Sequence, residues 1–253
     1  MTISIGQAPE YVKDNHCVTV GYRPEMTKSR AILSICGWHN ETINIWTHIF
    51  TTFVFVWLLT SNYSSWPLAI FIVAAIFLFS SSAAFHTMLC VSKEVYDWFR
   101  KVDFIGIVTI MFCMFLPFCW YTFSTIVFAV YITLASITSI ACVTVALSPK
   151  FSSNEFHVYR PLVFASLGLL GAICIVHGYL VHKDTWVASL CGAQLGCCTI
   201  GALFYMAKWP ERKYTWASYF GSHQIFHIFV AVGIWFFYMA NAQLLSNNNL
   251  GQM

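Results

Sequence analysis

The sequence predicts an all-α membrane protein with seven transmembrane helices, and three observations support this fold class. Of the 253 residues, 58% are hydrophobic and only 9% are charged, whereas soluble globular domains carry about 25% charged residues. The apolar residues gather in runs of the roughly 20 residues that a helix needs to cross a bilayer. Lysines and arginines occur almost entirely in alternate loops, as expected for spans that pass back and forth.

The chain divides into three predicted parts. Residues 1–43 form a polar N-terminal segment, residues 44–243 form the transmembrane domain and residues 244–253 form a short external tail. The polar start has no apolar core, so we expect no cleavable signal peptide. A short amphipathic helix from Trp38 to His48 is expected to lead into the first span, with its tryptophans at the level of the lipid headgroups.

Seven apolar runs are long enough to be spans. They cover residues 44–61, 67–90, 103–121, 123–147, 161–181, 186–207 and 218–243. One very long helix could replace the third and fourth runs, because only Trp120–Ser124 separate them. Two spans are favoured, because a helix over 103–147 would be far longer than a bilayer is thick. Pro117 also weakens the helix before the proposed turn.

Basic residues predict the orientation of the spans. One side of the membrane would carry Lys13, Arg23, Lys28, Arg30, Lys93, Arg100, Lys101, Lys150, Arg160, Lys208, Arg212 and Lys213, and the other side only Lys183. Because basic residues concentrate in cytoplasmic loops, the N-terminus is predicted to be cytosolic and the C-terminus extracellular or lumenal. The net charge of +3 is too small and scattered for nucleic-acid binding. Most of the ten cysteines lie in apolar runs, where they are expected to pack as small apolar residues.

Three histidines in two spans predict a metal site. His223 and His227 lie four residues apart, so both imidazoles can face one ion from the same side of a helix. In the predicted topology, His86 near the end of the second span reaches the same depth in the cytoplasmic leaflet. Three histidines and an open fourth position are the ligand set of a catalytic zinc ion. Zn2+ is therefore the expected cofactor.

Two further polar residues are candidates for catalysis. Asp103 is expected to begin the third span at the same membrane edge, and Ser82 lies one turn from His86. Zinc activates a water molecule for attack on a carbonyl. Asp103 would accept a hydrogen bond from that water as a base or orienting group, and Ser82 would hold the water or an oxyanion.

Less specific interpretations apply to each residue taken alone. The histidine pair could form hydrogen bonds between helices, Asp103 could be a charge favoured at a helix N-terminus, and Ser82 could be a packing residue. Their shared depth favours the metal site. The remaining histidines are expected at the surface, in loops or at the membrane interface: His16, His39, His48, His157, His177 and His182.

Five ordered motifs carry a family resemblance. They are Asn40–His48, Ser82–Thr87, Asp103–Ile107, Pro210–Arg212 and Ser222–His227. Over about residues 20–240 the chain resembles the progestin and adipoQ receptor family, which includes the adiponectin receptors and the haemolysin III-like proteins. The resemblance implies zinc held by His86, His223 and His227, with a zinc-bound water contacting Asp103. The wider superfamily is similar to alkaline ceramidases, which implies a lipid cavity and hydrolysis of ceramide-like amides.

Whether the chain is an enzyme stays open at this stage. One hypothesis is a zinc-binding receptor of the adiponectin receptor type whose signalling is coupled to zinc-dependent, ceramidase-like hydrolysis of a lipid amide. The alternative is a non-enzymatic receptor or scaffold in which zinc is a structural clamp between the second and seventh helices. A transporter is weaker, since broken helices and midplane charges are not evident.

The expected partners follow from the same resemblance. They are a membrane lipid or ceramide-like substrate and an extracellular protein or steroid ligand, and no nucleic acid. The predicted location is an integral, multi-pass position in the plasma membrane or the Golgi, between which the sequence does not distinguish.

Overall fold

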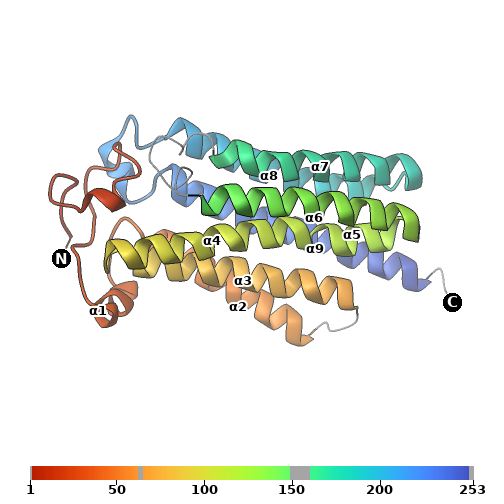
Figure 1. Cartoon of the computed structure of the whole chain (residues 1–253), viewed down its shortest axis with the longest axis horizontal. Helices are drawn as coiled ribbons and strands as arrows, with labels where there is room; N and C mark the ends of the chain where they lie inside the picture. Colours follow the sequence, from red (N-terminus) through yellow and green to blue (C-terminus); the bar gives the residue numbers. More distant parts are fainter. Residues whose placement is uncertain (1, 62–64, 149–159, 251–253) are drawn as a thin grey trace.

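The computed structural model describes residues 2–61, 65–148 and 160–250, and within them the protein is a bundle of long helices (Figure 1). The spans are α2 (Thr42–Ser61), α3 (Trp66–Met88), α4 (Lys93–Cys113) with α5 (Phe115–Thr122), α6 (Thr125–Leu147), α7 (Arg160–His182), α8 (Thr185–Ala207) and α9 (Ser222–Leu250). Seven helical segments of the described chain are long and apolar enough to cross a membrane. The seven-span prediction is therefore confirmed, and the protein is an integral, multi-pass membrane protein.

The two ends of the chain lie at opposite ends of the bundle, as an odd number of spans requires (Figure 1). Which end faces the cytosol stays a prediction, as does the division at residues 43 and 243. Lys150, which counts toward the predicted orientation, lies outside the described residues. So do residues 251–253 of the predicted tail.

The third span begins earlier than predicted. It begins at Lys93, ten residues before Asp103, because the Ser92 hydroxyl caps the helix by accepting a hydrogen bond from Val95 N (3.3 Å). Asp97 pairs with Lys93 and with Arg100, so the charged first turns are satisfied within the helix. The predicted break before the fourth span is confirmed, since α5 ends at Thr122 and α6 begins at Thr125.

The N-terminal residues 2–41, called here the N-terminal cap, fold over one end of the bundle (Figure 1). The cap contains a single described α-helix, α1 (Lys28–Leu33), and one isolated β-bridge between Ile3 and Tyr22. The Tyr96 hydroxyl donates a hydrogen bond to Asp14 (2.5 Å), and Met26 N donates to Cys90 O (3.1 Å). These contacts attach the cap to the ends of α3 and α4.

Close helix contacts at this end depend on glycine. A Cβ added to Gly201 of α8 would lie 2.9 Å from Phe229 Cβ of α9, and one added to Gly106 of α4 would lie 2.6 Å from Ser81 Oγ of α3. Both distances are shorter than real Cβ contacts. Small residues therefore let α8 approach α9, and α4 approach α3, at the level of the polar residues discussed below.

Candidate metal centre

Three imidazoles converge where α3 ends and α9 begins. His86 lies in the last turn of α3, and His223 and His227 lie in the first two turns of α9. The Nε2 atoms of His86 and His223 are 3.3 Å apart, and those of His223 and His227 are 3.1 Å apart. In the described chain these are the three residues whose ligand atoms all lie within 4.8 Å of one another. The structure therefore brings together the three histidines that the sequence predicts.

The spacing of the nitrogens fits a zinc ion. Imidazole nitrogens bind zinc at 2.0–2.1 Å, so two nitrogens of a tetrahedral site are about 3.3 Å apart. The observed separations of 3.1 and 3.3 Å are close to this value. His86 and His227 are each only 3% exposed, which excludes most water from the cluster. The three side chains could hold a metal ion that keeps one coordination position open.

Glu41 orients the first of these histidines. Its carboxylate oxygen lies 2.6 Å from His86 Nδ1, and Asn44 Nδ2 donates a second hydrogen bond to the same oxygen (2.7 Å). A proton on Nδ1 that is donated to Glu41 leaves Nε2 with its lone pair free for a metal. Sequence reasoning did not assign Glu41 a role. The signals that could have found it were its place in the Asn40–His48 motif and its position one turn before Asn44, at the start of an apolar run.

His48 is not an interfacial residue, contrary to the prediction. It is 3% exposed, and its ring stacks on His227 with a centroid distance of 3.9 Å and an interplanar angle of 14°. The edge of Phe79 packs against it at 5.0 Å. The prediction failed because α2 turns the His48 face inward, which a pattern of mostly apolar residues does not reveal. His39 is also buried, with Nε2 3.0 Å from Ser34 O.

Asp103 and Ser82 lie beside the histidine cluster. The Asp103 carboxylate interacts with the Ser82 side chain and is close enough to His86 to interact with it electrostatically. Ser82 is 3% exposed and lies one turn before His86 on α3. Gly106 lies one turn after Asp103 in α4. Because it has no side chain, α4 can pack closely against α3, which brings Asp103 near Ser82. Asp103 therefore reaches the site from within α4 rather than from the helix end that the sequence predicted.

A polar cavity of about 140 Å³ opens next to the cluster, between the N-terminal cap and the helix ends. Its lining includes Asp14, Tyr22, Arg23, Glu41 and His223. Burial raises the pKa of Tyr22, and the nearby carboxylates of Glu41 and Asp14 raise it further, so its hydroxyl stays protonated and neutral at physiological pH. The cavity gives water and polar groups a route to His86 and His223.

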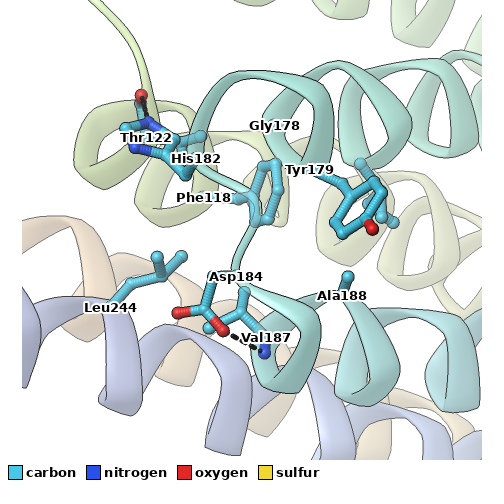
Figure 2. A pocket seen from close by; sticks show the side chains of 10 residues that line it. Phe118, Thr122, Gly178, Tyr179, His182, Asp184, Val187, Ala188 and Leu244 are labelled. Carbon is cyan, nitrogen blue, oxygen red and sulfur yellow. Dashed lines mark hydrogen bonds between the residues drawn. The ribbon is translucent and has the colours of Figure 1, made fainter.

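A second cavity lies at the opposite end of the bundle and is smaller and more apolar (Figure 2). It measures about 20 Å³, which is close to the space of one water molecule. His182 Nε2 hydrogen-bonds Thr122 O (2.6 Å), and Asp184 caps α8 by accepting from Trp186 N and Val187 N. The His182 ring and the Asp184 carboxylate thus already have partners, which leaves the histidine cluster as the stronger candidate.

Comparisons with known proteins agree with the seven-span fold. The family model of the haemolysin-III related proteins matches residues 36–238. The chain is 31% identical to heptahelical transmembrane protein 1 of Arabidopsis thaliana, over 91% of this chain and 77% of that protein. It is 32% identical to an adiponectin receptor protein of Drosophila melanogaster and 30% identical to progestin and adipoQ receptor-like protein 1 of Caenorhabditis elegans.

Coverage differs among these relatives. The matches extend over 88% and 93% of this chain but only 54% and 59% of the fly and worm proteins. The chain thus spans little more than half of those two relatives. The family match nevertheless extends over most of the seven-span domain and includes all three clustered histidines. On this evidence the chain belongs to the haemolysin-III related family, with adiponectin receptor and progestin and adipoQ receptor-like proteins among its relatives.

Proposed function

We propose that the protein is a zinc-binding receptor of the adiponectin receptor type whose signalling is coupled to hydrolysis of a ceramide-like lipid amide. The observation that carries the proposal is the convergence of three histidine side chains, with His223 Nε2 at zinc-like distances from the Nε2 atoms of His86 and His227 and with Asp103 and Ser82 nearby. The named relatives support the receptor class. The predicted cytosolic N-terminus would put the site in the cytoplasmic leaflet.

The residues divide the chemistry among them. His86, His223 and His227 would hold the ion, which when bound supplies the Lewis acidity that makes water a nucleophile near neutral pH. Asp103 would accept the proton of the attacking water as its oxygen bonds to the amide carbon. The same carboxyl group would give the proton to the amine nitrogen as the carbon–nitrogen bond breaks, leaving a fatty acid and a free amine.

Supporting residues set the geometry of this reaction. Glu41 would accept a hydrogen bond from the Nδ1 proton of His86, which leaves the lone pair of Nε2 directed at the cluster. Ser82 would hold the water or the oxygen of the carbonyl with its hydroxyl. The acyl chain of the lipid would lie among apolar side chains of the bundle, and the polar cavity under the N-terminal cap would admit water.

A second function has its own supporting observation. The helices α3 and α9, which carry the ligands, contact each other along little of their length. A metal bound by His86, His223 and His227 would therefore join two helices that are otherwise weakly connected. In this alternative, zinc is a structural clamp in a non-enzymatic receptor or scaffold that binds an extracellular protein or a steroid.

Zinc content and lipid hydrolysis measured together decide between the two functions. We would purify wild type, Asp103→Ala and the exposed α4 control Glu94→Ala in detergent, then measure zinc by elemental analysis and fatty-acid release from a long-chain ceramide. The enzyme proposal expects about one zinc in all three proteins and a rate loss of about 100-fold or more only in Asp103→Ala. Zinc without turnover in wild type would support the clamp. Absence of zinc from wild type would refute both.

A further inference from the structure

The two ligand-bearing helices both terminate at the site. The helix α3 ends at Met88, two residues after His86, and α9 begins at Ser222, one residue before His223. Helix ends leave backbone N–H and C=O groups without partners inside the helix. Whatever binds these groups also fixes the backbone of the neighbouring metal ligands.

Arg23 of the N-terminal cap binds the end of α3. Its Nη2 donates a hydrogen bond to the carbonyl of His86, and its Nη1 donates to the carbonyl of Thr87 (3.0 Å) and to Ser34 Oγ (2.9 Å). The side chain is buried, with the residue only 5% exposed. A guanidinium suits this position, because the last carbonyls carry the negative end of the helix dipole. Arg23 thus holds the peptide group of a predicted metal ligand itself.

Glu211 binds the start of α9 in the complementary way. Its carboxylate accepts hydrogen bonds from Ser222 N (2.7 Å) and from the Ser222 hydroxyl. The carboxylate approaches closely because Gly221 has no side chain; a Cβ there would lie 2.8 Å from Glu211 Oε2. The Pro210–Arg212 motif, which the sequence singles out, therefore serves the first turn of the helix that carries His223.

The N-terminal cap also holds this second contact. Asn15 Nδ2 donates to Glu211 Oε1 (2.8 Å), and Gln224 Nε2 donates to Asn40 O (2.6 Å). Asn40 N in turn donates to Gly21 O (2.9 Å), two residues before Arg23. The cap therefore grips both ligand-bearing helices at the residues next to the histidines.

We propose that the N-terminal cap is a positioning element of the metal centre. Its Arg23 and the Glu211 carboxylate, which the cap holds through Asn15, are the two positioning residues. Arg23 sets the place of His86, Glu211 sets the place of His223, and the cap links them so that the three Nε2 atoms keep their spacing. Neither residue needs to touch the metal. The proposal rests on metal binding by the histidines, which is part of the proposed function.

The test measures metal affinity rather than stability alone. Wild type, Arg23→Gln, Arg23→Lys and the exposed cap control Arg30→Gln would be titrated with zinc against a competing chelator and with Co²⁺ by visible spectroscopy. We expect Arg23→Gln to raise the zinc Kd about 10–100-fold, the range for residues that orient metal ligands, and to change the Co²⁺ spectrum. Arg23→Lys should recover part of the affinity, and Arg30→Gln should match wild type.

Other outcomes separate the two proposals. A zinc Kd of Arg23→Gln equal to that of wild type, even with a lower unfolding temperature of the metal-free protein, would make Arg23 merely structural and overturn the inference. If Arg23→Gln does not fold, Asn15→Ala tests the same linkage at Glu211 and should weaken zinc about tenfold; unchanged affinity there would also overturn it. Wild type that binds no zinc would instead refute the proposed function.

Discussion

The two ends of the helix bundle differ in the polarity of their buried side chains. In the described chain, the buried charged side chains of Arg23, Arg100 and Glu211 all lie at the end that holds the histidine cluster. The opposite end has a cavity of about 20 Å³, lined largely by apolar side chains such as Phe118 and Leu244. Buried charges and imidazoles in a membrane protein are costly unless they are paired or bind something.

The two ends therefore depend on different kinds of interaction. The apolar end needs only close packing, which lipid-facing helices achieve with small residues and aromatic rings. The cluster end keeps a network of paired polar groups, such as Glu41 with His86 and Arg23 with the α3 carbonyls. We therefore expect substitutions at the cluster end to change function, and matched substitutions at the opposite end to change stability only.

The largest expected effect is at a ligand. His227→Ala removes one of three metal-binding nitrogens, so zinc affinity should fall by more than about 100-fold, beyond the range for supporting residues. The matched substitution His182→Ala removes an imidazole at the opposite end and should leave zinc affinity unchanged. Isothermal titration with zinc measures both. Equal losses in the two variants would contradict the assignment of the cluster.

Glu41→Gln tests the support of His86. The amide cannot accept the Nδ1 proton as strongly as a carboxylate, so the zinc Kd should rise about 10–100-fold. Glu94→Gln, at an exposed position outside the cluster, is the control and should bind as wild type does. Competition with a chelator gives both constants. An unchanged Kd in Glu41→Gln would show that this carboxylate does not orient His86.

Glycine substitutions compare the two ends directly. Gly106→Ala places a methyl group 2.6 Å from Ser81 Oγ, and Gly178→Ala places one 3.0 Å from Phe118 Cζ. Each should lower the free energy of unfolding by about 1–3 kcal/mol through overpacking. Only Gly106→Ala should also slow lipid hydrolysis, since it separates Asp103 from Ser82. Denaturant titration and the ceramide assay would reveal whether the two effects are distinct.

A smaller effect concerns pH and the N-terminal cap. Burial, with Arg23 nearby, lowers the pKa of His39 to about 4 although Glu41 opposes the shift. As the pH falls from about 6.5 to about 4, the unfolded chain therefore binds a proton that the folded protein does not. Stability should fall in this window, by at most about 1.4 kcal/mol per pH unit from this group.

His39→Gln isolates that contribution. The variant lacks the titrating imidazole, so the free energy of unfolding of the metal-free protein should depend less steeply on pH between 4 and 6.5 than in wild type. Denaturant titrations at several pH values supply the two slopes. Parallel curves for the two proteins would show that His39 titrates alike in the folded and unfolded states.

Much of the architecture was predictable because it is local. The lengths of the apolar runs set the number of spans, and the i, i+4 spacing put His223 and His227 on one helix face. The five ordered motifs predicted the family, which the comparisons confirm. The predicted start of the third span at residue 103 was wrong. The helix begins at Lys93, because Asp97 pairs with Lys93 and Arg100 and charged residues can therefore form its first turns.

The sequence by itself therefore determined the seven apolar spans, the family and the three histidines of the cluster. Only the tertiary structure decided what surrounds those histidines. Glu41 reaches His86 across 45 residues of chain, and Arg23 reaches its carbonyl across 63. The stacking of His48 on His227 likewise joins α2 to α9. Such contacts depend on how helices pack and where the N-terminal cap folds, and periodicity within one helix carries no information about either.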